Sequence, residues 1–169
     1  MTFAQLSVTN RCNLRCRMCD IGQRSQLDAG LVKNLVRDEE LPAAKWLDIV
    51  GELQADDVHV LGVEPLLYSE LRELLRGLRE MRVSVYLTTN GFLLGEDIAT
   101  VLAECCDRIA ISIDGHTASL HDSIRGVPGS FDRAFRGLLR LKEMGVGDLK
   151  VSCAICPDNA AHLTDIYDL

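Results

Sequence analysis

The hydrophobic positions of the chain change their period along its length, and these changes predict alternating strands and helices. Short runs in which apolar residues alternate with polar ones, or follow one another, predict strands. Longer segments with apolar residues three and four positions apart predict amphipathic helices. The predicted strands are residues 5–9, 58–61, 83–88, 108–113 and 149–155. The predicted helices are residues 46–53, 71–81, 96–105 and 131–144, and another begins near residue 159.

Strands that alternate with helices in this way form βαβ units, and their strands pair in a parallel sheet. A closed eight-stranded barrel needs about 250 residues, whereas this chain has 169 residues. We therefore predict one α/β domain over residues 1–169, a partial TIM-like barrel of five βα units that stops before a sixth strand. The last predicted helix is cut short, as in a C-terminally incomplete domain. A polar stretch, residues 20–42, separates the first strand from the first helix.

Composition and charge narrow the function. Hydrophobic residues make up 47% of the chain, enough to form a core and too many for a disordered chain. The net charge is −7 and no basic stripe occurs, which argues against nucleic-acid binding. No apolar run approaches the ~20 residues that span a bilayer, and the N-terminus lacks the basic and apolar segments of a secretory signal. We predict a cytoplasmic protein without a membrane or nucleic-acid partner.

Three of the seven cysteines lie close together in a C-x3-C-x2-C pattern, at Cys12, Cys16 and Cys19. Structural zinc sites and ferredoxin clusters usually take four protein ligands, and no second local pair completes such a set. Three thiolates fit a 4Fe–4S cluster with one iron left open. The same spacing would also place three buried cysteines on one helix face, but the charged residues between them make a poor core helix.

The other cysteines carry weaker signals. Cys105 and Cys106 lie at the end of a predicted helix and are expected to be small buried residues. Cys153 and Cys156 form a C-x2-C pair near the fifth strand. This pair could belong to a second metal site, although no further pair is present to complete it.

Polar residues mark the ends of the predicted strands, where the active site of a (β/α) barrel lies. In the fourth strand, isoleucines alternate with polar residues, so Ser112 and Asp114 share the face opposite the isoleucines. A buried carboxylate needs a partner, which suggests a polar ligand near Asp114. Beyond this strand, Arg125 could pair with a carboxylate or phosphate, and Ser130 is the expected N-cap of helix 131–144. We interpret His121 as structural.

These features resemble the radical S-adenosylmethionine (SAM) superfamily. Its C-x3-C-x2-C loop follows the first strand, as here. Residues 62–65 (Gly-Val-Glu-Pro) resemble its G-G-E-P motif, with Val63 in place of the second glycine. Residues 89–91 resemble its T-N-G, residues 112–115 its S-I-D-G, and residues 121–131 the H-D-x-I-R-G…G-S-F stretch of members that also carry SPASM or twitch domains.

The resemblance implies an enzyme with a partial (β/α)6 barrel. Cys12, Cys16 and Cys19 would bind three irons of a 4Fe–4S cluster, and SAM would bind the fourth iron. Reductive cleavage of SAM would give a 5′-deoxyadenosyl radical, which abstracts hydrogen from the substrate. The implied cofactor-binding residues are Met18, Gly62, Glu64, Asn90, Ser112, Asp114 and Arg125.

The resemblance also implies partners: a one-electron reductant such as a flavodoxin or ferredoxin, and an unknown substrate, either a peptide or a small molecule. Two other interpretations remain open. A simple electron-transfer iron–sulfur protein would need a fourth thiolate and would have no use for the motifs at the strand ends. A truncated, non-catalytic protein could still bind a cluster.

Overall fold

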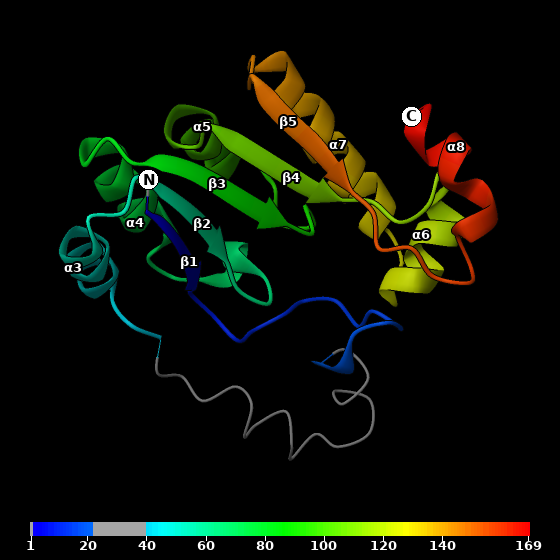
Figure 1. Ribbon diagram of the computed structural model, residues 1–169. Coiled ribbons are helices and arrows are strands. Elements are labelled where there is room, and N and C mark those ends of the chain that lie inside the picture. Colours follow the sequence, from blue (N-terminus) through cyan, green and yellow to red (C-terminus); the bar gives the residue numbers. More distant parts are fainter. Residues whose placement is uncertain (1, 22–39) are drawn as a thin grey trace.

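The computed structural model describes residues 2–21 and 40–169, which contain a five-stranded parallel sheet (Figure 1). The strands are β1 (Phe3–Ser7), β2 (Asp57–Leu61), β3 (Ser84–Thr89), β4 (Arg108–Ser112) and β5 (Asp148–Ser152). They lie in chain order, and β1 and β5 form the two edges. The predicted α/β class and open, partial barrel are confirmed. Most of the predicted polar stretch, residues 22–39, lies outside the described residues.

In the described residues, the longer helices cover one face of the sheet, and the short ones gather beyond the strand ends (Figure 1). The covering helices are α3 (Ala43–Leu53), α4 (Leu71–Glu80), α5 (Glu96–Cys105) and α7 (Ser130–Glu143). The short elements are η1 (Pro65–Leu67), α6 (Ala118–Arg125), η2 (Ala160–His162) and α8 (Leu163–Tyr167). Helix α6 was not predicted because it buries only two side chains, too few to reveal a period. No helix of the described residues has the length and hydropathy to cross a membrane.

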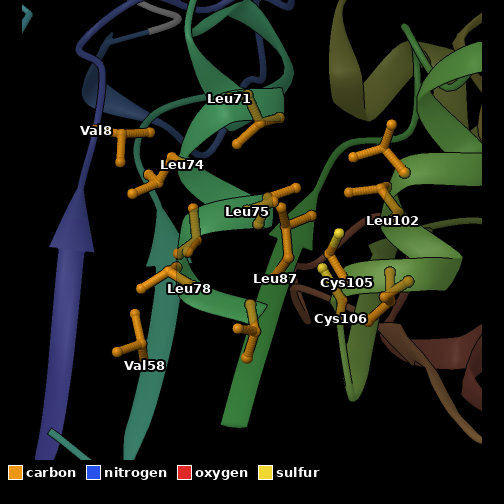
Figure 2. Close-up of a cluster of buried hydrophobic side chains, with 14 of the residues drawn as sticks. Val8, Val58, Leu71, Leu74, Leu75, Leu78, Leu87, Leu102, Cys105 and Cys106 are labelled. Atoms are coloured by element: carbon orange, nitrogen blue, oxygen red, sulfur yellow. The ribbon is translucent and has the colours of Figure 1, made fainter. Parts of the chain in front are cut away.

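The core lies between the sheet and the four covering helices. Every second strand residue points into it, and Ile109, Ile111 and Ile113 are fully buried there, as the alternation predicts. Figure 2 shows the leucines of α4 between the strands and α5. Cys105 and Cys106 also lie in this core and are 4% and 7% exposed, which confirms that they are buried small residues.

The other face of the sheet carries polar side chains, because the remaining strand positions point to it. His59, Thr88 and Ser112 come from three neighbouring strands and line one cavity. The edge strand β5 ends at Ser152, earlier than predicted. The chain leaves the sheet there because the backbone N–H of Ala154 donates to the Asp114 carboxylate, 2.9 Å away.

The start of α7 corrects one prediction. Ser130 is the first helical residue, and Gly129, with a φ of +79°, is the N-cap. The cap comes instead from Asp122 of α6, which accepts hydrogen bonds from the backbone N–H groups of Gly129 and Phe131 and from the Ser130 hydroxyl, at 2.6–2.8 Å. Burial alone would raise the pKa of Asp122, but these three bonds hold it below its usual value.

We therefore expect Asp122→Ala to lower the free energy of unfolding by about 1–3 kcal/mol, the usual cost of losing a charged cap. Because the pKa of Asp122 is lower in the folded protein than in the unfolded chain, this contribution exists above about pH 4 and is lost as the pH falls through the lowered value. Urea titrations at neutral and acid pH measure it. Asp132→Ala, on the exposed first turn of α7, is the matched control. Equal unfolding midpoints for the two variants at neutral pH would contradict this assignment.

Candidate functional site

A cavity of about 460 Å³ lies at the C-terminal ends of the strands. This volume is within the range of small-molecule sites. Nine of the ten predicted site residues line it: Cys12, Cys16, Met18, Cys19, Gly62, Glu64, Asn90, Ser112 and Arg125. Another cavity, of about 670 Å³ between η1, α4 and the start of α5, contains none of the ten. The structure thus brings together residues that are up to 113 positions apart, from Cys12 to Arg125.

The three cysteines lie on an irregular loop and not on a helix face, so the alternative of a cysteine-bearing core helix is wrong. A turn from the N–H of Cys19 to the carbonyl of Cys16, 3.1 Å, closes the second half of the loop. Within the described residues, these thiols are not among the groups close enough to share one metal ion.

The cysteine loop rests on the last turn of α6. The backbone N–H of Arg15 donates to the carbonyl of Arg125 at 3.1 Å, and that of Arg17 donates to the carbonyl of Ile124 at 2.8 Å. Gly126 follows with a φ of +72°, and a Cβ at this position would collide with the backbone of Arg15. The glycine of the H-D-S-I-R-G stretch is therefore required both by its conformation and by the approach of the cysteine loop.

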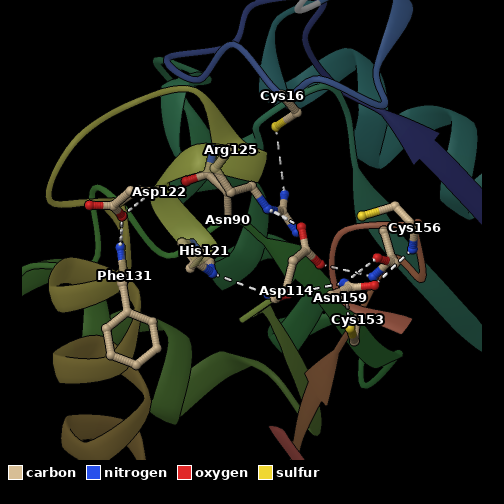
Figure 3. A network of polar contacts seen from close by, with 12 residues as sticks. Cys16, Asn90, Asp114, His121, Asp122, Arg125, Phe131, Cys153, Cys156 and Asn159 are labelled. Carbon is tan, nitrogen blue, oxygen red and sulfur yellow. Dashed lines mark hydrogen bonds and ion pairs between the residues drawn. The ribbon is translucent and has the colours of Figure 1, made fainter. Parts of the chain in front are cut away.

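Arg125 lies between the cysteine loop and Asp114 (Figure 3). Its Nη1 is 3.9 Å from the sulfur of Cys16, and its Nε is 2.6 Å from Oδ2 of Asp114. Burial raises the pKa of the Cys16 thiol, and the positive charge of Arg125 opposes this shift. The predicted pairing of Arg125 with a carboxylate is confirmed, and the guanidinium also places a positive charge beside a thiol of the loop.

Glu64 is fully buried and connects the ends of β2 and β3. Its Oε1 accepts hydrogen bonds from the N–H of Leu66 at 3.0 Å and from the hydroxyl of Thr89 at 2.7 Å. Its Oε2 accepts one from the N–H of Asn90 at 2.8 Å. Burial raises the pKa of Glu64, and these bonds oppose the rise. A carboxylate accepts about four hydrogen bonds, so one acceptor position remains for a ligand.

Two further contacts fix the loop against the strand ends. The side-chain amide of Asn90 donates to Oδ1 of Asn13, 2.9 Å away, which joins the T-N-G segment to the cysteine loop. At Gly62, a Cβ would lie 2.7 Å from the carbonyl oxygen of Thr9, so only glycine allows this approach. Both residues line the cavity, and both also hold its walls together.

Asp114 differs from its prediction, because it does not line the cavity. Its partners in the described residues are protein groups: the Arg125 guanidinium, which forms an ion pair with Oδ2, and the backbone N–H of Ala154, which donates to Oδ1. Asn159, also fully buried, completes this region by donating from Nδ2 to the carbonyls of Asp114 at 3.0 Å and Ala154 at 2.9 Å. Asp114 lies outside the cavity lining and contributes to the site by holding Arg125 in position.

The cavity also contains residues that the sequence analysis did not assign to it. His59 stacks on Tyr86, with ring centroids 4.2 Å apart, and its Nε2 lies 2.8 Å from the hydroxyl oxygen of Thr88. Cys153 reaches the cavity from the end of β5. Period-two alternation could have identified His59 and Thr88, which point away from the helices, but the path of the chain after β5 could not be read from the sequence.

His121 is structural, as we interpreted it. Its side chain is fully buried, and its Nδ1 accepts a hydrogen bond from the backbone N–H of Asp114 at 3.1 Å. Burial lowers the pKa of His121 to about 4, and the nearby charge of Arg125 adds to the effect. The ring is therefore neutral at ordinary pH and serves as an acceptor that fixes the end of β4.

Comparison with known proteins agrees with this geometry. The Radical SAM superfamily matches residues 6–169. An AdoMet-dependent heme synthase of Oleidesulfovibrio alaskensis is 31% identical over 96% of this chain and 40% of its own. The mycofactocin maturase MftC of Mycobacterium tuberculosis is 34% identical over 96% of this chain and 40% of its own. The crystal structure of Streptococcus suis SuiB bound to S-adenosylmethionine has the same fold, with a TM-score of 0.77 at 20% identity over 98% of this chain and 37% of that chain.

The chain therefore belongs to the Radical SAM superfamily, and the family resemblance stated from its motifs is confirmed. The cofactors expected from those motifs, SAM and a 4Fe–4S cluster, are those of this superfamily. The chain spans about 40% of the length of the curated relatives it matches.

The contact between Gly126 and Arg15 generates a prediction about the cysteine loop. Gly126→Ala should displace the loop and reduce the iron that the chain retains after anaerobic reconstitution by more than half. Gly129→Ala is a matched control, because its φ of +79° carries the same backbone strain while its Cβ would meet nothing within 4 Å. Iron per chain and the unfolding midpoint report the two effects. Similar iron contents in both variants would show that loop contact at Gly126 is unimportant.

Proposed function

We propose that this chain is the cofactor-binding core of a radical SAM enzyme and holds a 4Fe–4S cluster and SAM at the C-terminal ends of its strands. The observation that carries the proposal is the cavity itself. Three thiols and Met18 of the cysteine loop line it together with Gly62, Glu64, Asn90, Ser112 and Arg125, which come from other parts of the chain. Such convergence of sequence-distant polar groups is expected of a ligand site.

Cys12, Cys16 and Cys19 would hold the cluster, each by one thiolate. Burial raises the pKa of Cys12 to about 11, so the free thiol is protonated and must lose its proton when metal binds. Arg125 would offset part of the negative charge that collects on the thiolates, since its guanidinium is 3.9 Å from the sulfur of Cys16. Asp114 would keep Arg125 in this position.

Glu64 would bind the ammonium group of SAM through its remaining acceptor position. Its other three bonds fix the carboxylate before any ligand arrives, which reduces the ordering cost of binding. A cation beside the buried carboxylate favours its charged form. Ser112, Asn90, Gly62 and Met18 would form the walls around the rest of the molecule.

When bound, the two cofactors supply one-electron cleavage of SAM to a 5′-deoxyadenosyl radical. The residues of the chain position the ligands and shield the cavity from water. A flavodoxin- or ferredoxin-like protein would donate this electron. Relatives are named as a heme synthase and a mycofactocin maturase, and SuiB was crystallised with a precursor peptide. The substrate class we propose is accordingly a peptide or small molecule that places a C–H bond in the cavity.

An electron-transfer protein would need a fourth thiolate, and Cys153 is the thiol outside the loop that reaches the cavity in the described part of the chain. In our proposal Cys153 binds no iron, which makes it a discriminating control. Cys16→Ala should lower iron and sulfide after anaerobic reconstitution and abolish 5′-deoxyadenosine formation with dithionite, because one of three ligands is lost. Cys153→Ala should keep its full iron content.

Three other outcomes would decide against parts of this proposal. Equal iron in wild type and Cys16→Ala would exclude the cysteine loop as the cluster site. Loss of iron in Cys153→Ala would favour a four-thiolate electron-transfer centre. A full cluster with no 5′-deoxyadenosine from the wild type would favour a non-catalytic protein.

Glu64→Gln tests the SAM site separately from the cluster. We expect SAM affinity to fall roughly 10- to 100-fold, because a charge-assisted contact is worth about 1.5–3 kcal/mol, while iron content stays unchanged. The measurement is the concentration of SAM that perturbs the EPR spectrum of the reduced cluster. Glu80→Gln, on the exposed side of α4, controls for the change in net charge. Equal SAM affinity in both variants would contradict the placement of the ammonium group at Glu64.

A further inference from the structure

Outside the cavity, two histidines and an aspartate converge beside the C-terminal helix. His116 lies between β4 and α6, His162 ends η2, and Asp165 lies in α8. Their ligand atoms all lie within 4.8 Å of one another. Figure 1 shows α6 and α8 next to each other at this end of the molecule. The set contains no cysteine and belongs to neither the loop nor the cavity.

The three groups are arranged around a common point. Oδ2 of Asp165 is 3.1 Å from Nδ1 of His162 and 4.0 Å from Nδ1 of His116. The two imidazole rings lie with centroids 4.8 Å apart at an angle of 39°. Ligands about 2.1 Å from a tetrahedral zinc ion lie about 3.4 Å from one another. The 3.1 Å and 4.0 Å separations from Asp165 lie on either side of this value, and no two of the three ligand atoms are more than 4.8 Å apart.

The hydrogen bond between His162 and Asp165 does not explain why the His116 ring lies beside them. Its Nδ1 is buried and has no hydrogen-bond partner, and a buried polar atom normally has one. His162 and Asp165 are on one segment and pair without it. His116 contributes from a different part of the chain, as a third ligand would.

We propose that His116, His162 and Asp165 bind a zinc ion, with water in the fourth position. Two imidazoles and one carboxylate are a ligand set that suits zinc and other borderline divalent metals, whereas magnesium and calcium prefer oxygen ligands alone. The histidines would bind through Nδ1 in their neutral form.

The ion would have a structural role, because it would join α8 and η2 to the segment that follows β4. Asn159, just before η2, holds the carbonyls of Asp114 and Ala154. Fixing His162 therefore also fixes the turn after β5, which carries Cys153 into the cavity. Zinc would stabilise this wall without taking part in the reaction.

The test is calorimetric titration of zinc into the anaerobically reconstituted full chain, with Asp165→Asn and His116→Asn as site variants. Asp168→Asn, exposed three residues beyond Asp165, is the matched control for charge. We expect one zinc site in the wild type and in the control, weakened roughly 10- to 100-fold or more in both site variants. Zinc should raise the unfolding temperature of the wild type and not that of Asp165→Asn. In EDTA, Asp165→Asn and Asp168→Asn should unfold like the wild type, since both carboxylates are exposed.

X-ray absorption at the zinc edge identifies the ligands, and we expect the difference between the wild type and Asp165→Asn to contain nitrogen and oxygen only. Sulfur in that difference, or equal zinc affinity in the wild type and Asp165→Asn, would overturn the proposal. Zinc held by cysteines would appear equally in both proteins, so their difference reports on the proposed site whether or not the cluster has assembled. The result is thus independent of the proposed radical SAM function.

Discussion

The docking of the cysteine loop on the end of α6 is the contact on which the site depends. The last carbonyl groups of a helix have no partner within the helix, and in α6 two of them accept the N–H groups of Arg15 and Arg17. Gly126 permits the approach because it has no side chain. A loop without regular secondary structure is thereby held at a fixed distance from the sheet, and its three thiols face the same cavity as the ends of β2, β3 and β4.

The buried pair of Arg125 and Asp114 extends this arrangement from α6 to the sheet. Removing two charges from water can cost more free energy than their mutual attraction recovers. The pair therefore contributes more to the positioning of Arg125 than to the stability of the fold. Asp114 has no exposed surface and also receives the N–H of Ala154, which bends the chain away from β5. The same carboxylate therefore orients the guanidinium beside Cys16 and the wall that carries Cys153 (Figure 3).

The sequence predicts the parts of this structure that repeat and misses those that depend on single long-range contacts. Period two in residues 108–113 identifies which face of β4 is buried, because alternation follows from the pleat. Ser130 is a good N-cap residue by type, yet Asp122 takes that role because α6 brings it to the helix start. Asp114 was expected to face a ligand, since nothing in the sequence shows that Arg125 lies 2.6 Å away.

The polar residues of the site hold one another before any ligand is present. Glu64 joins β2 to β3, Asn90 joins β3 to the cysteine loop, and Asp114 joins β4 to α6. Each of these residues uses some of its hydrogen-bonding capacity on the protein, and Glu64 retains one acceptor position. Binding to a preorganised site avoids much of the entropy cost of ordering side chains.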